Sequence, residues 1–498
     1  MTTQPAGSLW LKQHFALEHH RVSHRSYIGT RNKIQAGRDG GVDQTYGPKY
    51  APGDDDVTGH IEFMLKYDDL SLDLLTAVFN RISERELLGY ISGNPGGRYA
   101  RKTGFLYEWL TGRTLSLEHT PEGNYTDLLD EQRYITGIKY RNSRWRVNDN
   151  LLGTPAFCPV VRRTPALTEM LARDIKKIIT NLKEAYTPGT FNRAAQYLYR
   201  KETRSSYEIE SETPSPDRMQ RFITLLRQAG RQPGGVVLEE KNLTALQNTI
   251  VDPRYMQPGF RQFQNYIGQT DHRMEEIYHY ICPPPGMVRS MMEGLTALEK
   301  KTAGIPAAIR AALIAFGFVF IHPFLDGNGR IHRFLIHDML TRDGLAEQDV
   351  VIPISARMLN NMRDYDAALE DFSLPLMQRI RFIRSADGEI TVTNPEETAP
   401  YFRYPDLTVQ SAYLAHTIYA AVRQDLSDEL SFLQHYDELK KDLSNLVDMP
   451  DKGLDSIIVY LHQNKGVFPN RRKKNFPEIT EQEFTAMENL YREIFRDV

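Results

Sequence analysis

An uninterrupted apolar run, Ala311 to Ile321, leads directly into a short polar loop, and this junction constrains the fold most strongly. The run has eleven residues, which is too few to span a bilayer, so it predicts an apolar helix of a soluble protein. The loop that follows is HPFLDGNG, residues 322–329, and Arg330 then opens an amphipathic pattern. The sequence therefore predicts a helix, a loop and a second helix over residues 306–341.

Composition places the chain among soluble globular proteins. Of its 498 residues, 41% are hydrophobic and 25% are charged, which predicts two to four packed units rather than disorder. The formal net charge of −3 gives no basic excess of the kind that non-specific nucleic-acid binding needs, so nucleic acid is not an expected partner. Two cysteines, Cys158 and Cys282, exclude a disulfide-stapled scaffold. With no signal-peptide pattern and no membrane-spanning run, a cytoplasmic protein is expected.

Hydrophobic periodicity predicts a mostly α-helical fold in which a helical core lies between two further regions. Residues 1–190 are expected to mix irregular and helical structure, with a helical pattern at 60–111, interrupted by a loop at 92–98, and an amphipathic helix at 164–186. Further helices are expected at 193–202, 216–229, 239–249 and 287–302. Residues 400–498 are expected to form a helical C-terminal region, interrupted by the basic stretch Arg471 to Lys474.

Two β-hairpins are expected within this helical frame. Residues 263–281 are rich in aromatic and β-branched residues and end at a run of three prolines, Pro283 to Pro285. In the segment 377–395, Asp387-Gly388 lies between alternating apolar residues, a pattern typical of a tight hairpin turn.

The loop at residues 322–329 has the residue types needed to bind a phosphate group. Gly327, Asn328 and Gly329 stand at a helix start, where free backbone N–H groups and the helix dipole favour an anion. Arg330 and Arg333 lie in the first turn of that helix and can bind phosphate oxygens in a bidentate manner.

Two other residues of the loop are suited to the chemistry of a bound polyphosphate. The carboxylate of Asp326 is a suitable oxygen ligand for the Mg²⁺ that accompanies a polyphosphate. His322 titrates near neutrality and is suited to take a proton from a hydroxyl group. Each feature alone is common in structural turns, but six compatible roles within twelve residues favour a catalytic site.

HPFLDGNGRIHR, His322 to Arg333, resembles the HxFx(D/E)GNGRxxR signature of the Fic-domain family, whose members mostly transfer AMP from ATP to protein hydroxyls. The resemblance implies a Fic-type helical core at residues 191–376 with ATP as co-substrate. It also implies that His322 is the general base and that Asp326 holds Mg²⁺. Gly327, Asn328 and Gly329 would bind the α- and β-phosphates, assisted by Arg330, while Arg333 reaches the γ-phosphate and Phe324 anchors the loop.

Three further segments resemble accessory parts of the family. The hairpin near 263–282 stands where the family places a flap that holds the target protein. NMRDYDAAL, residues 361–369, resembles a helix that closes the nucleotide site, with Asn361 and Tyr365 near the adenosine, although a core tyrosine is an equal alternative. KETRSSYEIES, residues 201–211, resembles an inhibitory helix with the pattern (S/T)xxxE(G/N), matched by Ser206 and Glu210. Ser211 departs from the usual Gly or Asn.

The sequence therefore predicts a nucleotidyltransferase, namely an ATP- and Mg²⁺-dependent protein adenylyltransferase that is inhibited by its own Glu210. Its acceptor is a Ser, Thr or Tyr hydroxyl of a target protein bound along the flap, and self-modification is compatible with the same site. One alternative is the reverse reaction, with Glu210 orienting water to remove AMP from a modified protein. Another is a non-catalytic regulator that senses ATP or binds DNA through Arg471 to Lys474.

Overall fold

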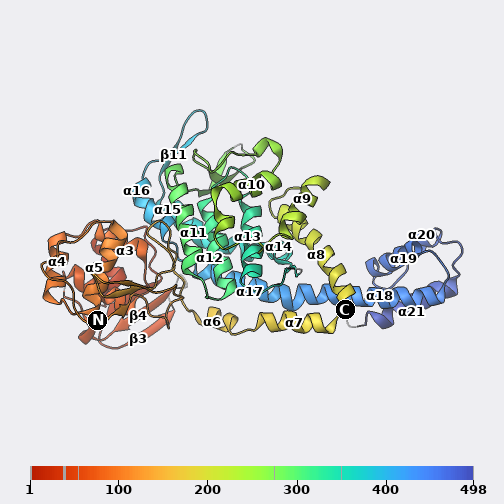
Figure 1. Ribbon diagram of the computed structural model, residues 1–498, viewed down its shortest axis with the longest axis horizontal. Helices are drawn as coiled ribbons and strands as arrows, with labels where there is room; N and C mark the ends of the chain where they lie inside the picture. Colours follow the sequence, from red (N-terminus) through yellow and green to blue (C-terminus); the bar gives the residue numbers. More distant parts are fainter. Residues whose placement is uncertain (1–2, 37–40, 54, 274, 349, 497–498) are drawn as a thin grey trace.

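The computed structural model describes residues 3–36, 41–53, 55–273, 275–348 and 350–496. The three largest hydrophobic cores divide these residues into an N-terminal lobe, a central helical lobe and a small C-terminal lobe. A small fourth cluster in the N-terminal lobe contains Ala6, Tyr46 and Phe63. Figure 1 shows the three lobes side by side along the longest axis of the molecule.

The N-terminal lobe contains more β-structure than its sequence indicates. A four-stranded sheet in the order β1-β2-β4-β3 is built from β1 Gln4–Ala6, β2 His24–Ile28, β3 Lys33–Ala36 and β4 Val42–Tyr46. A second sheet, in the order β5-β7-β6, is built from β5 Thr126–Asp127, β6 Tyr140–Asn142 and β7 Val147–Asp149. The expectation of only irregular and helical structure in residues 1–190 is wrong at these strands. They are short, and β2 with β4 and β5 with β7 pair in parallel across long connections that leave no hairpin signal.

The helices of the N-terminal lobe pack around its own core. They are α1 Gly7–His14, the short helix η1 Pro48–Tyr50, α2 Val57–Tyr67, α3 Leu72–Phe79, α4 Glu84–Gly93 and α5 Arg98–Thr111. The helix expected at 164–186 is two helices, α6 Pro165–Leu171 and α7 Ile175–Ala185, which lead along the central lobe (Figure 1). The chain breaks there because Asp174 caps α7, its carboxylate accepting the Lys177 N–H at 2.9 Å.

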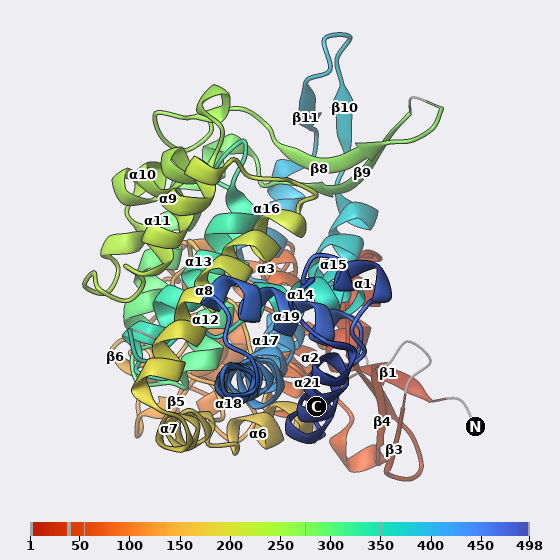
Figure 2. The same ribbon diagram turned by 90° about the vertical axis from the view of Figure 1, so that its right-hand side faces the viewer.

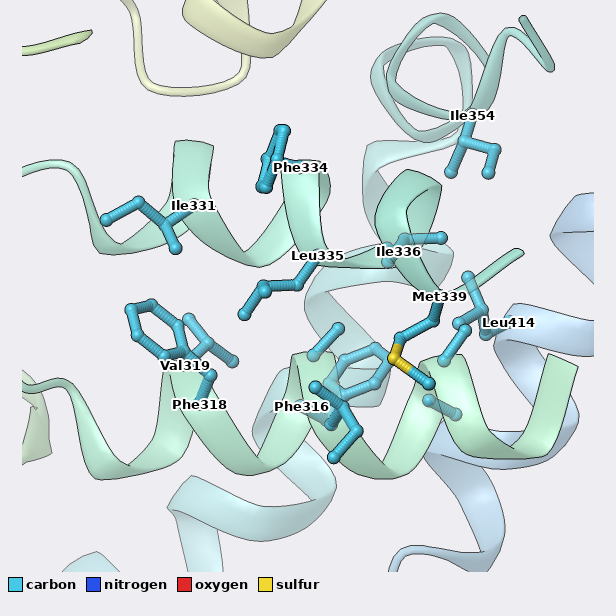
Figure 3. Close-up of a cluster of buried hydrophobic side chains, with 14 of the residues drawn as sticks. Phe316, Phe318, Val319, Ile331, Phe334, Leu335, Ile336, Met339, Ile354 and Leu414 are labelled. Carbon is cyan, nitrogen blue, oxygen red and sulfur yellow. The ribbon is translucent and has the colours of Figure 1, made fainter. Parts of the chain in front are cut away.

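The central lobe contains the apolar helix and the helix that follows the loop. Its members are α8 Pro188–Glu208, α9 Pro216–Leu226, η2 Val236–Leu238, α10 Glu240–Ile250, η3 Pro253–Tyr255, α11 Pro285–Lys301, α12 Ala307–Ile321, α13 Asn328–Arg342, α14 Ile354–Asn360 and α15 Met362–Arg379. Helix α12 is buried along almost its whole length, and α13 packs along it. Figure 3 shows Ile331, Leu335 and Met339 of α13 directed towards Phe316, Phe318 and Val319 of α12. The loop with the candidate residues therefore joins two largely buried helices of the central lobe.

Both expected hairpins are present and lie beside one another. The first consists of β8 Tyr266–Thr270 and β9 Glu276–Ile281, and the second of β10 Phe382–Arg384 and β11 Ile390–Val392. The ring of Phe382 lies 5.2 Å from that of Tyr278, and Arg384 Nη2 lies 2.9 Å from a carboxylate oxygen of Glu276. Figure 2 shows the two hairpins projecting from the same end of the central lobe.

The C-terminal part of the chain is helical, as expected. It comprises α16 Pro395–Arg403, α17 Thr408–Ala420, the π-helical stretch η4 Ala421–Leu426, α18 Ser427–Leu446, α19 Asp451–Gln463, α20 Asn470–Lys473 and α21 Glu481–Ile494. Helix α17 packs on α12 in the central lobe, and the continuous path through η4 and α18 leads out to the C-terminal lobe (Figure 1).

The fold as a whole is mostly α, with 56% of the residues in helices and few small sheets. This agrees with the fold class expected from the sequence. Among the described residues, no helix combines the length and apolar character that crossing a membrane requires.

Candidate active site

The loop between α12 and α13 begins and ends in left-handed backbone. His322 has φ 53° and caps the C-terminus of α12, while Gly327 has φ 87° and precedes α13. Glycine adopts this conformation freely, but for a histidine it costs about 1–2 kcal/mol, so contacts around His322 must hold it in place. One of them is a hydrogen bond of 2.7 Å from Arg261 Nε to the His322 carbonyl oxygen.

The imidazole of His322 is oriented as a neutral base. Its Nδ1 lies 3.1 Å from the carbonyl oxygen of Val319. Because a carbonyl can only accept a hydrogen bond, we assign the proton to Nδ1, which leaves Nε2 with a lone pair. Burial lowers the pKa of His322 to about 4, so the ring is uncharged at neutral pH and Nε2 can accept a proton.

The side chain of Asn328 closes the loop on itself. Its Oδ1 accepts the Phe324 N–H at 3.0 Å and its Nδ2 donates to the Phe324 carbonyl at 2.8 Å. Phe324 is fully buried, with its ring 5.5 Å from that of Phe260. The amide of Asn328 therefore shapes the loop, and the group it can offer a ligand is its backbone N–H at the start of α13.

The first two arginines of α13 are buried and share one carboxylate. Arg330 and Arg333 are 0% and 2% exposed. The Oε2 atom of Glu210 lies 2.9 Å from Arg330 Nε, and its Oε1 lies 2.6 Å from Arg333 Nη2. Ser206 adds two contacts to Arg333, through its hydroxyl at 2.8 Å and its carbonyl oxygen at 2.6 Å. Ser206 and Glu210, singled out from the sequence, thus both contact the loop-following helix.

The Glu210 carboxylate covers the start of α13. A Cβ atom built on Gly329 would lie 2.2 Å from Glu210 Oε1. The carboxylate therefore lies against the glycine backbone, at the helix terminus that favours an anion. Glycine at position 329 permits this close approach.

The turn after α8 directs a second glutamate to the same place. Ser211 has φ 58°, and the turn is closed by a hydrogen bond of 3.0 Å from the Glu212 N–H to the Tyr207 carbonyl. The carboxylate of Glu212 lies 3.2 Å from Arg330 Nη1 and 2.9 Å from Arg218 Nη2. Ser211 thus adopts the backbone that Gly or Asn would favour at this position.

Asp326 completes a cluster of three carboxylates with Glu210 and Glu212, whose oxygen atoms lie within 4.8 Å of one another. Its Oδ1 accepts from the Gly327 N–H at 2.6 Å and from Arg330 Nη2 at 2.5 Å. The guanidinium of Arg330 contacts all three carboxylates and supplies the positive charge between them. Asp326 stands on the loop itself and is the member suited to share a divalent cation with a bound phosphate.

One segment of the central lobe matches a known protein family. Residues 237–340, from η2 through α13, match the model of the Fic/DOC family. These residues form a Fic/DOC family domain. Its matched segment includes the flap and the whole loop with both arginines, whereas Ser206 and Glu210 lie before it and Asn361 and Tyr365 lie after it.

Solved structures similar to this chain are Fic proteins, although the similarity is low. A Fic family protein from Desulfovibrio desulfuricans G20 has 18% identity and a TM-score of 0.38, covering 53% of this chain and 75% of its own. A Fic-domain-containing signaling protein from Bacteroides thetaiotaomicron VPI-5482 has 18% identity and a TM-score of 0.36, covering 53% of this chain and 97% of its own. No curated protein matches this chain.

The two residues proposed near an adenosine lie at the start of α15, beside the Fic domain. Tyr365 is buried, its ring 6.2 Å from that of His332 and 6.1 Å from that of Tyr413. Burial raises the pKa of Tyr365, and the nearby charge of Arg333 opposes that rise. The amide of Asn361 donates to the Arg357 carbonyl at 2.9 Å. Tyr365 therefore adjoins the arginine site, whereas the side chain of Asn361 contacts the last turn of the preceding helix, α14.

Arg261 is a site residue that the sequence does not reveal. It is 1% exposed and contacts carbonyl oxygens on both sides of the flap as well as that of His322. Its partners Pro283 and His322 lie 22 and 61 residues away, so neither periodicity nor a short motif could indicate it.

Two residues of the basic stretch in the C-terminal lobe, Arg472 and Lys473, make local contacts. The Arg472 guanidinium lies 5.2 Å from the ring centre of Tyr460, and the Lys473 ammonium lies 5.1 Å from that of Phe484. Lys473 also forms an ion pair with Glu481. This packing does not favour a nucleic-acid surface at Arg471 to Lys474.

Proposed function

We propose that this protein is an adenylyltransferase that transfers AMP from ATP to a hydroxyl group of a target protein. One observation carries the proposal: a neutral histidine stands at one end of a loop whose other end is a glycine-rich helix start with two buried arginines. The histidine supplies a base for a hydroxyl group, and the helix start with its arginines supplies hydrogen-bond donors for a triphosphate. Fic/DOC membership of residues 237–340 agrees with nucleotidyl transfer.

In the proposed reaction, His322 Nε2 accepts the proton of a Ser, Thr or Tyr hydroxyl as its oxygen attacks the α-phosphorus. The bond between the α-phosphorus and the bridging oxygen breaks, and pyrophosphate leaves. The N–H groups at residues 328 and 329 and the guanidinium of Arg330 stabilise the charge that develops on the phosphate oxygens. Mg²⁺, held by Asp326 together with the phosphates, would neutralise part of that charge.

The acceptor segment is proposed to lie along the hairpin of β8 and β9. Ile267 and Ile277, one on each strand, are each 42% exposed, so this hairpin presents apolar side chains and backbone to an incoming strand. Its base adjoins the loop, because Asn265 Nδ2 donates to the Phe324 carbonyl at 3.0 Å. A segment added to the hairpin would therefore extend towards His322.

We further propose that Glu210 inhibits the transfer. Three guanidinium groups face three carboxylates at the helix start: Arg218, Arg330 and Arg333 against Glu210, Glu212 and Asp326. This balance leaves no net positive charge for a strongly anionic triphosphate. Release of the α8 end would remove two of the negative charges and free Arg333 for the γ-phosphate.

The test uses ATP labelled at either the α- or the γ-phosphorus, incubated with the protein and a cell lysate. Transfer of AMP leaves the α-label on protein, and replacing His322 by Ala should lower that signal by about 10²- to 10⁴-fold. Label from the γ-position alone would indicate a kinase instead. Loss of AMP from a modified protein, without incorporation, would indicate the reverse reaction.

A further inference from the structure

Arg261 is a buried cation whose contacts are carbonyl oxygens. Its Nε donates to the His322 carbonyl at 2.7 Å, its Nη1 to the Phe263 carbonyl at 2.8 Å and its Nη2 to the Pro283 carbonyl at 2.7 Å. A weaker contact of 3.4 Å joins Nη2 to the Ile321 carbonyl. Burial lowers the pKa of Arg261, which reflects how costly a charge is in this position.

These contacts join the two ends of the flap to the residue proposed as the base. Phe263 lies just before β8 and Pro283 just after β9, so one guanidinium spans the flap's base. The backbone N–H of Arg261 adds a hydrogen bond of 2.9 Å to the Pro323 carbonyl. The planar guanidinium group contacts the chain at Phe263, Pro283 and His322 at once and so fixes the spacing of these three segments. The flexible ammonium group of a lysine could not do this.

The same contacts hold His322 in its unfavourable backbone conformation. Arg261 Nε donates a hydrogen bond to the carbonyl oxygen of His322, which has φ 53°. The ring Nδ1 of His322 lies within hydrogen-bond distance of the Val319 carbonyl oxygen. Without the guanidinium, the peptide after His322 would be free to relax towards an ordinary helix end. The imidazole would then lose its fixed orientation.

We propose that Arg261 is a positioning residue that sets the distance between the flap-bound hydroxyl and His322 and keeps the imidazole in one tautomer. The catalytic part of this inference rests on the proposed AMP transfer. An arginine that served stability alone would gain more from a carboxylate partner, as Arg310 does at the other end of α12 with Glu299 at 2.8 Å.

The experiment replaces Arg261 by Lys, which keeps the positive charge but lacks the planar guanidinium group with its several donors. Arg310→Lys is the matched control. Both changes are made in Glu210→Gly protein, which is the form expected to be active. Three quantities are measured: the tautomer of His322 by ¹⁵N NMR of histidine-labelled protein, AMP incorporation into lysate protein, and ATP affinity by calorimetry.

Arg261→Lys should give a mixture of His322 tautomers and lower AMP incorporation by about 10²-fold, since a misplacement of about 1 Å has an effect of this size. ATP affinity should stay within about twofold, because no phosphate-binding group is changed, and Arg310→Lys should leave the tautomer and incorporation at the starting level. A single tautomer with unchanged incorporation in Arg261→Lys would overturn the proposal.

Two further results separate this proposal from the proposed function. If no variant transfers AMP, the proposed function fails, and the NMR signal alone decides whether Arg261 orients His322. If Arg261→Lys does not fold, Asn265→Ala, which removes the other contact between flap and loop, takes its place. It should lower incorporation about tenfold with the tautomer intact, and unchanged incorporation would count against the proposal.

Discussion

Ser211 stores backbone strain at the end of the proposed inhibitory helix. Its φ of 58° costs a non-glycine residue about 1 kcal/mol, a cost that is relieved if the turn opens and releases Glu210. A glycine at this position would remove the strain only from the form in which the turn is closed and Glu210 contacts the two arginines. We therefore expect Ser211, which departs from the family pattern, to weaken the proposed inhibition.

Ser211→Gly should lower AMP transfer by the otherwise unchanged protein about fivefold, the equivalent of about 1 kcal/mol. The measurement is the initial rate of α-label incorporation. Lys465→Gly is the matched control, because Lys465 has φ 52° in the C-terminal lobe and its replacement should leave the rate unchanged. A higher rate in Ser211→Gly would contradict the strain argument.

The lowered pKa of His322 predicts an unusual pH dependence. A base is active in its neutral form, and burial places the pKa of His322 at about 4, so the neutral form dominates at all higher pH values. The rate of Glu210→Gly protein at saturating ATP should stay level from pH 8 to about 5.5 and fall only as the pH approaches 4. A rate that falls with an apparent pKa near 6.5 would mean that the base is solvent-exposed.

For single residues, the sequence predicts the members of the candidate site well where they belong to a local pattern. The loop residues 322–329 and the arginines that follow lie within twelve positions, so the chemistry of the loop could be proposed before the structure. Ser206 and Glu210 are indicated by the resemblance of their segment to an inhibitory (S/T)xxxE pattern, and the structure places both against Arg333. Arg261 could not be recognised, since its role depends on carbonyl groups that only the tertiary fold brings to it.

Among the secondary-structure elements, α8 carries the chain into the contact between Glu210 and the two arginines, which we propose to be inhibitory. Its buried Glu202 accepts the backbone N–H of Ser355 at 2.8 Å at the start of α14, and lies 2.7 Å from His337 Nε2 of α13. A charged group in such contacts contributes about 1.5–3 kcal/mol. Glu202 thus attaches the helix that carries Ser206, and that leads into the turn with Glu210, to two helices of the central lobe.

Glu202→Gln should loosen α8 and raise AMP transfer about tenfold, corresponding to about 1.4 kcal/mol of lost attachment. Glu208→Gln changes a half-exposed residue of the same helix and should leave the rate as it was. In Glu210→Gly protein, the change at Glu202 should have no further effect on incorporation. Should Glu202→Gln lower the melting temperature without raising the rate, α8 does not act by detaching.

Element boundaries show where local patterns stop being sufficient. The apolar runs of α12 and the turn at Asp387-Gly388 gave correct positions for a helix and a hairpin, because each signal lies within the element. Helix α8 begins at Pro188, where the Thr187 side chain caps it by accepting the Thr190 N–H, and ends at Glu208, so it extends well beyond the expected 193–202. Strands β2 and β4 depend on pairing with distant segments, which periodicity does not report.

On the scale of the whole molecule, the C-terminal lobe has a hydrophobic core of its own. Leu443 of α18, Ile458 of α19 and Met487 of α21 are fully buried within it, and α18 continues from there towards the central lobe. A domain with its own core can lose stability without disturbing its neighbours.

Leu461→Ala, in the core of the C-terminal lobe, should lower the local free energy of unfolding by about 2–5 kcal/mol. Hydrogen exchange should increase in residues 451–494 and stay unchanged in α12 and α13. Leu295→Ala, in the central core, should instead increase exchange in α12. Increased exchange in α12 caused by Leu461→Ala would show that the lobes unfold as one unit.

The most direct test of the account is AMP incorporation by three proteins: the unchanged chain, Glu210→Gly, and Glu210→Gly combined with His322→Ala. Removal of the carboxylate from Arg330 and Arg333 should raise incorporation about tenfold or more, equivalent to at least about 1.4 kcal/mol of relieved inhibition. The added loss of His322 should return it to background. Incorporation that stays flat or falls in Glu210→Gly would contradict the claim that Glu210 restrains an AMP-transferring site.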